Sequence, residues 1–230
     1  ENIKSGILVI SDNVELSQHL LDIIKVDSRL AGTSCEIRYS CKNQSAEGMR
    51  KLGGTAIDLK NDASINEIIS TYSVVFSLHC KQIFPSALVD HVRCINVHPG
   101  LNPYNRGWFP QIFSIVNGLP AGVTIHLMDN EVDHGPVIYQ HPIPIMEYDT
   151  SLEVYRKIIT TEKALLSEHF ADLVSGNYQS TTLENAGNYN SIQDFKSLCE
   201  IDLQDSDTME NHLNILRALT HGNLNNAFFT

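Results

Sequence analysis

Short runs of apolar residues alternate along the chain with longer segments in which apolar residues recur every three or four positions. The short runs have the length of strands buried on both faces, and they occupy residues 6–10, 35–39, 56–59, 73–78, 94–98, 121–128 and 137–145. Amphipathic helices are expected between them, including one opened by a capping-box pattern at Ser64–Glu67 and a long one over Ser151–Ser175. Strands that alternate with helices predict an α/β fold with a Rossmann-like, mostly parallel sheet.

The pattern changes after Gly176. The segment that follows is rich in Asn, Ser and Thr, and it carries two short helical patterns at 191–199 and 209–219. We therefore expect one domain over residues 1–180 and a short C-terminal extension over residues 181–230. The first strand is followed by Ser11-Asp12-Asn13 rather than by a glycine-rich loop, so the usual modes of binding NAD or ATP are not expected.

The chain is acidic, with 16 Lys and Arg against 27 Asp and Glu among 230 residues and a formal net charge of −11. This charge repels phosphate, so neither nucleic acid nor an anionic membrane surface is an expected partner. No apolar run approaches the roughly 18 residues that a membrane span needs. The five cysteines form no C-x-x-C pair, which favours reduced thiols and a cytoplasmic location.

Candidate chemistry gathers at the end of the fifth expected strand. Asn96 and His98 lie two residues apart, so both side chains project from one face of the strand. Asp133 lies in a later polar loop. An amide, an imidazole and a carboxylate suffice for acyl transfer to an amine, because the first two can donate to an oxyanion and the carboxylate can orient the imidazole. The alternative is structural: a turn-capping Asn, a half-buried His and a turn Asp.

Three further histidines raise the question of a metal site. His126, His134 and His141 are separated by eight and seven residues, a spacing that matches no standard zinc pattern. We expect no metal ion. His126 lies within an expected strand, where a hydrogen-bonded structural role is favoured.

The run Asn96–Gly107 resembles the N-x-H-P-S-L-L-P-x-x-x-G signature of the folate-dependent formyltransferases. Asn117-Gly118, Gly122–Asp129 and Val132–Gly135 are similar to the N-G, G-V-T-I-H-x-M-D and L-D-x-G elements of that family, in the same order. The resemblance implies the Rossmann-like formyltransferase fold and N10-formyltetrahydrofolate as formyl donor. It also implies that Asn96, His98 and Asp133 are the catalytic residues.

Two departures from the signature narrow the resemblance. The segment Asn102–Pro110 resembles the sugar N-formyltransferases that act on dTDP-linked amino sugars, and most closely the branch that formylates dTDP-4-amino-4,6-dideoxyglucose for O-antigen or other surface polysaccharides. The 50 residues after 180 are too few for the second domain of the methionyl-tRNA enzymes. They are similar to the short tail that helps sugar enzymes bind nucleotide and dimerise, so a homodimer is implied, although Phe228 and Phe229 stand where Tyr is expected.

The resemblance also implies ligand contacts. The residues expected to contact the formyl donor lie in two segments that follow expected strands: Lys81, Gln82, Ile83, Met128, Asp129 and Asn130. The substrate contacts are polar and aromatic residues of one loop and the tail, Asn102, Tyr104, Asn105, Arg106, Trp108, Arg217, Phe228 and Phe229. Solvated surface cations and a core Trp are the structural alternatives. Alternative functions are formylation of a dTDP-3-amino sugar, glycinamide ribonucleotide or methionyl-tRNA, and a non-catalytic folate- or nucleotide-binding module.

Overall fold

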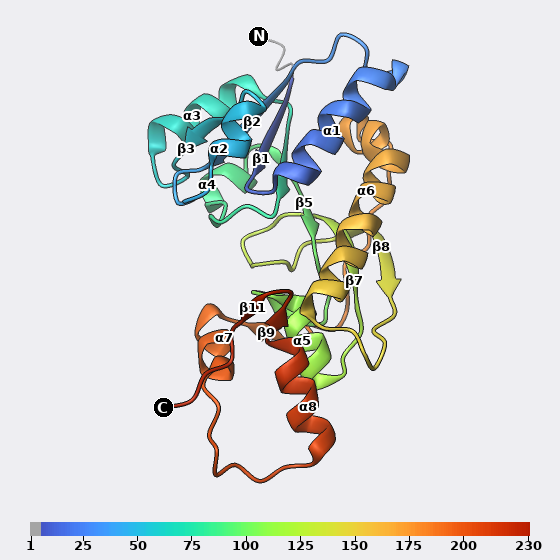
Figure 1. Ribbon diagram of the computed structural model, residues 1–230. Helices are drawn as coiled ribbons and strands as arrows, with labels where there is room; N and C mark the ends of the chain where they lie inside the picture. Colours follow the sequence, from blue (N-terminus) through green and yellow to red (C-terminus); the bar gives the residue numbers. More distant parts are fainter. Residues whose placement is uncertain (1–5) are drawn as a thin grey trace. The chain divides into compact units, whose positions relative to one another are not determined.

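A seven-stranded sheet forms the centre of the fold in the computed structural model, which describes residues 6–230 (Figure 1). Its strands are β1 (Ile7–Ser11), β2 (Cys35–Ser40), β3 (Thr55–Ile57), β4 (Val74–Leu78), β5 (Arg93–His98), β7 (Ala121–Leu127) and β8 (Val137–Ile143). They lie in the order β3-β2-β1-β4-β5-β7-β8, and the first five pair in parallel. The predicted α/β, mostly parallel fold is confirmed.

Eight α-helices, a 3₁₀ helix at Ser28–Leu30 and four short strands are the other regular elements of the described part of the chain. The helices are α1 (Val14–Val26), α2 (Glu47–Lys51), α3 (Asp62–Thr71), α4 (Ser86–Val89), α5 (Pro110–Asn117), α6 (Ser151–Ser175), α7 (Ile192–Cys199) and α8 (Met209–Ala218). The short strands are β6 (Arg106–Gly107), β9 (Tyr189–Asn190), β10 (Thr220–His221) and β11 (Leu224–Asn225).

The two faces of the sheet bury alternate residues of each strand. Leu8 and Ile10 of β1 belong to a buried cluster that includes Ile68 of α3 and Leu88 of α4. On β4, Phe76 instead packs on Phe170 of α6, with ring centroids 4.9 Å apart. Helices on both faces explain why these strands are apolar throughout rather than alternately polar.

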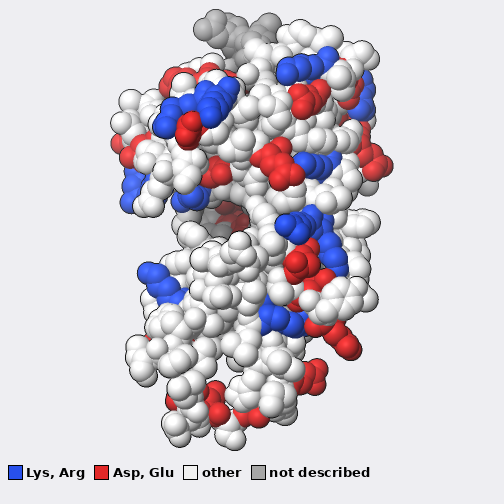
Figure 2. All heavy atoms as spheres, in the orientation of Figure 1, with Lys and Arg blue, Asp and Glu red and all other residues white. Residues whose placement is uncertain are grey.

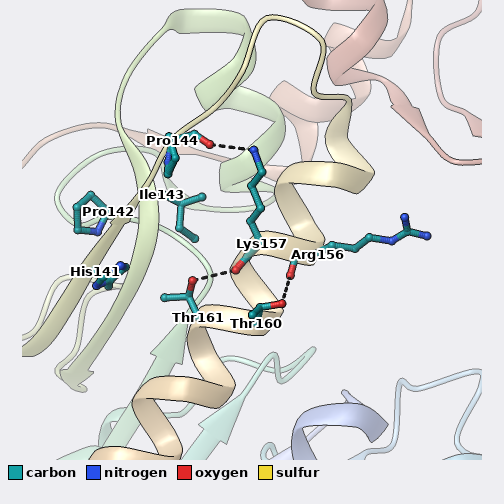
Figure 3. Close-up of a pocket in the computed structure, with 8 residues that line it drawn as sticks. All are labelled: His141, Pro142, Ile143, Pro144, Arg156, Lys157, Thr160 and Thr161. Carbon is teal, nitrogen blue, oxygen red and sulfur yellow. Dashed lines mark hydrogen bonds between the residues drawn. The ribbon is translucent and has the colours of Figure 1, made fainter.

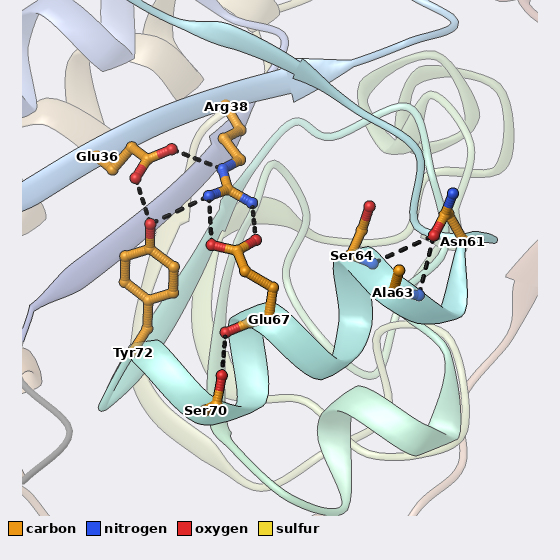
Figure 4. A network of polar contacts seen from close by, with 8 residues as sticks. All are labelled: Glu36, Arg38, Asn61, Ala63, Ser64, Glu67, Ser70 and Tyr72. Atoms are coloured by element: carbon orange, nitrogen blue, oxygen red, sulfur yellow. Dashed lines mark hydrogen bonds and ion pairs between the residues drawn. The ribbon is translucent and has the colours of Figure 1, made fainter. Parts of the chain in front are cut away.

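The start of α3 differs from the expectation. Asn61 caps this helix, because its Oδ1 accepts hydrogen bonds from the amides of Ala63 at 2.9 Å and Ser64 at 3.2 Å (Figure 4). The helix begins at Asp62, so the predicted capping box opening at Ser64 is wrong. Asn is a strong N-cap residue, and it lies three positions earlier along the same amphipathic stripe.

A polar cluster beside α3 ties this helix to β2. The Arg38 guanidinium lies between the carboxylates of Glu36 and Glu67, at 2.7 and 2.6 Å, and Tyr72 donates its hydroxyl to Glu36 (Figure 4). Burial opposes ionisation of Glu36, but the hydrogen bonds from Arg38 and Tyr72 outweigh it and lower the pKa of Glu36. Every member of the cluster has a partner, which is typical of a structural role.

The chain forms two compact units. The first runs through His98 and adds Ile125–Tyr139 and Glu162–Thr182, and the second comprises Pro99–Thr124, Gln140–Thr161 and Leu183–Thr230. Each unit therefore draws on separate stretches of sequence. The division at residue 180 remains a prediction about the sequence.

Charge is spread over the visible surface. Figure 2 shows Lys and Arg interspersed with Asp and Glu, with no single basic patch on the face it presents. Within residues 6–230, none of the helices combines the length and the apolar character that crossing a bilayer requires.

Candidate active site

The carboxyl end of β5 carries two polar side chains of the expected constellation. Asn96 is half-buried and His98 is only 3% exposed. Asn96 lies opposite Ser77 of β4 in the parallel ladder. Open α/β sheets bind their ligands at this edge, so both residues lie where the sequence placed them.

The loop between β7 and β8 brings Asp133 to the same edge. The amide of Met128 donates to the Cys94 carbonyl of β5 at 2.9 Å, which holds the start of the loop against that strand. A Cβ at Gly135 would lie 1.9 Å from the Leu127 carbonyl oxygen, so only glycine fits where the loop returns. Asp133 itself adopts a left-handed backbone with φ of 51°, a conformation that Asp tolerates better than most residues.

The Asp133 carboxylate joins the two β5 side chains. The Asn96 Nδ2 donates to Asp133 Oδ1 at 2.9 Å, and His98 Nδ1 lies 3.4 Å from Asp133 Oδ2. The carboxylate is 10% exposed. Each of its oxygens therefore faces a different group, and the amide, imidazole and carboxylate form one cluster within the first unit.

His126 of β7 is a member of this cluster that the sequence reasoning placed outside it. Its Nδ1 lies 2.7 Å from the Leu127 carbonyl, which only accepts, so Nδ1 carries the ring proton. The opposite nitrogen, Nε2, then accepts from Asn96 Nδ2 at 3.3 Å and lies 3.7 Å from Asp133 Oδ1. The buried, hydrogen-bonded state of His126 agrees with its expected structural character, but its contacts orient the Asn96 amide.

The first group of predicted donor contacts follows β4. The side chain of Gln82 is buried and holds the end of β3, since its Oε1 accepts from the Leu59 amide at 2.9 Å and its Nε2 donates to the Ile57 carbonyl at 2.8 Å. Lys81 is exposed, and Ile83 is 75% exposed. Only the last two side chains face solvent, so a direct side-chain contact from Gln82 would require breaking two buried hydrogen bonds.

The second group of predicted donor contacts lies on the loop after β7. Met128 is partly buried against the core cluster of the first unit. Asp129 Oδ2 accepts from His134 Nδ1 at 2.8 Å, and Asn130 Nδ2 donates to Asp90 Oδ1 at 3.3 Å. These bonds order the loop that also carries Asp133.

In the second unit, Asn105 is the hub of a closed hydrogen-bond network. It is fully buried, and its Oδ1 accepts from Asn117, Asn188 and Asn190 at 2.7, 2.8 and 3.2 Å. Its own amide nitrogens donate to Ser114 Oγ at 3.0 Å, Asn117 Oδ1 at 3.2 Å and Asn188 Oδ1 at 2.8 Å. Asn105 was predicted as a substrate contact. Its side chain instead stabilises its loop, and both of its polar atoms already have hydrogen-bonding partners.

The rest of that loop is fixed mainly through its backbone. The amide of Asn102, a residue only 4% exposed, donates to Thr124 Oγ1 at 2.9 Å. Arg106 and Trp108 donate their amides to the carbonyls of Asn188 and Asn190, at 3.0 and 2.9 Å. Tyr104 is half-buried and the Trp108 ring is 42% exposed. The Asn-rich segment after Gly176 thus pairs with this loop through backbone hydrogen bonds. Its composition did not predict this role.

Arg217 is engaged inside the second unit. Its guanidinium donates to the carbonyls of Met146 and Asp149 at 3.1 and 2.7 Å and to Asn214 Oδ1 at 2.8 Å. These contacts hold the guanidinium within the second unit, so Arg217 is neither a solvated surface cation nor an open anion site.

The two aromatic residues at the end of the chain are ordered by their backbone. The Phe228 amide donates to the Cys199 carbonyl at 2.9 Å, and its own carbonyl accepts from Ile201 at 2.8 Å. The rings of Phe228 and Phe229 remain 49% and 65% exposed. A docked backbone with exposed rings suits a surface that contacts another molecule.

A surface cavity of about 420 Å³ lies in the second unit between the end of β8 and α6 (Figure 3). Its two hydroxyl-bearing residues, Thr160 and Thr161, donate to backbone carbonyls of α6. Lys157 donates to the Pro144 carbonyl at 3.2 Å and pairs with Asp149 at 2.5 Å. The Arg156 side chain extends away from the cavity. The side chains of Lys157, Thr160 and Thr161 are therefore engaged within the fold.

Among the described residues, no group of three or more His, Cys, Asp and Glu side chains is arranged to hold a metal ion. All five cysteines are free thiols. Burial raises the pKa of Cys35, Cys80 and Cys94 to about 12 in each case, which leaves these thiols protonated and poorly nucleophilic. The chemistry of the site therefore depends on its amide, imidazoles and carboxylate.

Comparisons with known proteins agree with this architecture. The formyl transferase family profile matches residues 31–170, and a profile described as an N-formyltransferase dimerization C-terminal domain matches residues 194–230. A dTDP-4-amino-4,6-dideoxyglucose formyltransferase of Mycobacterium tuberculosis is 48% identical over 165 residues, which cover 72% of this chain and 70% of the relative.

Solved structures extend the similarity over nearly the whole chain. A sugar N-formyltransferase from Shewanella sp FDAARGOS_354 has a TM-score of 0.96 and 46% identity, covering 99% of this chain and 93% of that one. An N-formyltransferase from Helicobacter canadensis, solved with folinic acid and dTDP-3-aminofucose, shares the fold with a TM-score of 0.71 at 20% identity, covering 93% and 80% of the two chains.

Proposed function

The chain belongs to the formyl transferase family, and from that premise we propose that it transfers a formyl group from N10-formyltetrahydrofolate to the amine of a dTDP-linked 4-amino-4,6-dideoxy sugar. The observation that carries the proposal is the Asp133 carboxylate placed between Asn96 and His98 at the carboxyl end of β5. The 48% identical relative named for dTDP-4-amino-4,6-dideoxyglucose supports the choice of acceptor.

The reaction begins with attack of the neutral sugar amine on the formyl carbon. The carbonyl oxygen gains negative charge, and the site must donate hydrogen bonds to it. We assign this role to His98 Nε2 and Asn96 Nδ2. Of the two contacts of the Asn96 amide, the one to His126 is the longer, at 3.3 Å against 2.9 Å, so it is the one exchanged for the formyl oxygen.

Collapse of the tetrahedral intermediate needs two proton movements. The attacking amine loses a proton, and N10 of the departing tetrahydrofolate gains one. The amine proton passes either to Asp133 or to His98, whose protonated form Asp133 then stabilises, because Asp133 Oδ2 faces His98 Nδ1. His98 then protonates N10. Neither a covalent enzyme intermediate nor a metal ion enters this scheme.

The positions of the ligands are proposals drawn from the sequence resemblance. The donor would contact the loops around Lys81–Ile83 and Met128–Asn130. The dTDP-sugar would contact the loop Asn102–Trp108, with Arg106 as the candidate phosphate ligand because a guanidinium matches phosphate oxygens. Arg217 is the weaker candidate, since its donors already meet carbonyls. The Helicobacter canadensis relative, solved with folinic acid and a dTDP-sugar, supports both ligand classes.

We further propose that the protein is a homodimer formed through its C-terminal segment. The dimerization profile matches residues 194–230. This region exposes large apolar side chains, namely Leu203, Met209, Leu213, Leu216, Leu224, Phe228 and Phe229. Their burial against a second copy would remove them from water. A cytoplasmic location and a role in O-antigen or other surface polysaccharide synthesis remain predictions.

The proposal is tested by mixing the protein with N10-formyltetrahydrofolate and a panel of amines: dTDP-4-amino and dTDP-3-amino sugars, glycinamide ribonucleotide and methionyl-tRNA. Mass spectrometry of the products reads the gain of one formyl group. The expected result is formylation of the dTDP-4-amino-4,6-dideoxy sugar, about 1,000-fold slower with the Asp133→Asn variant. Formylation of glycinamide ribonucleotide or methionyl-tRNA alone would contradict the acceptor, and no product from any amine would contradict the activity.

A further inference from the structure

The strand order of the sheet reverses between β1 and β4, because β1 leads to β2 on one side and β4 leads to β5 on the other. Open α/β sheets form their ligand crevice at such a point, outside the carboxyl ends of the strands. Asn13, which follows β1, and His79, which follows β4, meet there with Asn13 Nδ2 and His79 Nδ1 3.3 Å apart. The amide donates, so His79 carries its proton on Nε2.

Helix α6 supplies the partner of that proton. His79 Nε2 lies 2.8 Å from Glu162 Oε1, and the Glu162 side chain is fully buried. Burial raises the pKa of Glu162, and His79 opposes this rise. Within residues 6–230, His79 is the one hydrogen-bonding partner of the Glu162 carboxyl group, and a buried polar group with so few partners is costly compared with an apolar residue. The hydrogen bond between His79 and Glu162 lies beside the edge of the sheet where ligands are expected to bind, so it can influence the loop that follows β4.

The backbone at His79 links the pair to the donor loop. His79 has a φ of 51°, a left-handed conformation that is uncommon outside glycine and that His, like Asn and Asp, adopts more often than other residues. Asn13 and Glu162 contact the two nitrogens of the His79 ring, and both contacts restrain this turn. This turn directs the chain from β4 into Cys80–Ile83. Asp12 fixes the next step, since its Oδ2 accepts from the Lys81 amide at 2.7 Å.

We propose that His79 and Glu162 are positioning residues for the formyl donor: their hydrogen bond fixes the turn after β4 and thereby the shape of the Cys80–Ile83 loop that receives the reduced folate. The inference rests on the proposed function, because that function makes this loop part of the donor site. Neither side chain takes part in the transfer itself. Loss of the bond therefore weakens binding of the donor and leaves the chemical step and the acceptor site unchanged.

The test compares Glu162→Leu, which removes the acceptor without leaving a buried charge, with Glu162→Gln, which retains an oxygen for His79 Nε2. Binding of 5-formyltetrahydrofolate is measured by calorimetry, and KM for each substrate and kcat by the mass assay. Glu162→Leu is expected to weaken folate binding and raise the donor KM about tenfold, as loss of a hydrogen bond to a charged group predicts. Its kcat and acceptor KM stay within about twofold, and Glu162→Gln restores most of the donor affinity.

Lys163→Ala is the matched control. Lys163 is the next residue of α6 and pairs with Glu15 of α1, so the variant breaks a contact of the same helix without touching His79. It should bind folate like the wild type. If Glu162→Leu does not fold, His79→Asn replaces it, because Asn tolerates the left-handed backbone but ends short of Glu162.

Unchanged folate affinity in Glu162→Leu would overturn the inference alone. A parallel change of both KM values and kcat would also overturn it, because a general loss of structure has that effect. A wild-type protein that binds no folate would contradict the proposed function and this inference together.

Discussion

Asn96 and Asn105 are the same residue type within one sequence motif, yet their surroundings differ. Asn105, in the second unit, meets only neutral amides and a hydroxyl, and each polar atom of its side chain has a partner. Asn96, in the first unit, lies between a carboxylate and an imidazole. A saturated neutral network has no proton to move, whereas the partners of Asn96 can change charge. The comparison distinguishes a residue that stabilises its loop, Asn105, from a candidate catalytic residue, Asn96.

The largest expected effect is on catalysis in the first unit. Asp133→Asn keeps the size of the side chain but removes the charge that faces His98. We expect kcat to fall about 1,000-fold, within the range for loss of a positioned acid–base group, with little change in stability. The product-mass assay measures kcat, and urea unfolding checks the fold. A near-wild-type rate in a folded variant would assign Asp133 to the structural class with Asn105.

The next effect is on stability in the second unit. Asn105→Ala empties a fully buried position and leaves the side chains of Asn117, Asn188 and Asn190 without their common partner, so we expect the free energy of unfolding to fall by roughly 2–4 kcal/mol. Asn96→Ala is the matched variant and should cost about 1 kcal/mol or less. Urea unfolding of both tests the comparison directly, and equal losses of stability would erase it.

A smaller effect is expected at the rim of the same network. Asn190 contributes a single side-chain bond to Asn105, at 3.2 Å, which is longer than the bond from Asn188 at 2.8 Å. Asn190→Ala should therefore cost only about 1 kcal/mol of stability. The acceptor KM reports whether the loop Asn102–Trp108 has moved. A loss as large as that of Asn105→Ala would show that the hub is not centred on Asn105.

The smallest effect concerns the pH dependence of stability. Burial raises the pKa of Glu162 above its ordinary value of 4.5, so between that value and the folded pKa the native state binds a proton that the unfolded chain has released. Stability then falls as pH rises through this window. Glu162→Gln lacks the titration. The stability difference, wild type minus variant, should decrease as the pH rises above 4.5; a constant difference in urea unfolding would contradict the pKa shift.

Periodicity was enough to predict the sheet, because its strands are apolar on both faces and separated by amphipathic helices. It placed β2 at Cys35–Tyr39 and α6 at Ser151–Ser175, against observed bounds of Cys35–Ser40 and Ser151–Ser175. It failed at the start of α3, where two capping signals competed and the Asn61 side chain was the one that bonded. When two possible N-cap residues are similarly favourable, the hydrogen bonds that form in the fold determine where the helix begins, and the sequence alone does not show these bonds.

The candidate site was predictable only in part. Asn96, His98 and Asp133 could be brought together from strand alternation and motif order, and the structure places them in contact. The contribution of His126 was missed because it depends on β7 lying next to β5 in the sheet. The saturation of Asn105 was missed because its partners Asn188 and Asn190 lie more than 80 residues away. Long-range neighbours, rather than residue type, decide these roles.

The most direct test of the account is the single-turnover rate of formyl transfer in His98→Ala, measured with saturating donor and the dTDP-4-amino sugar. The imidazole of His98 is assigned both to the oxyanion and to the protonation of N10. The account predicts that folate binding is retained while the rate falls at least about 100-fold. A folded His98→Ala protein that binds folate and transfers the formyl group at the wild-type rate would contradict it.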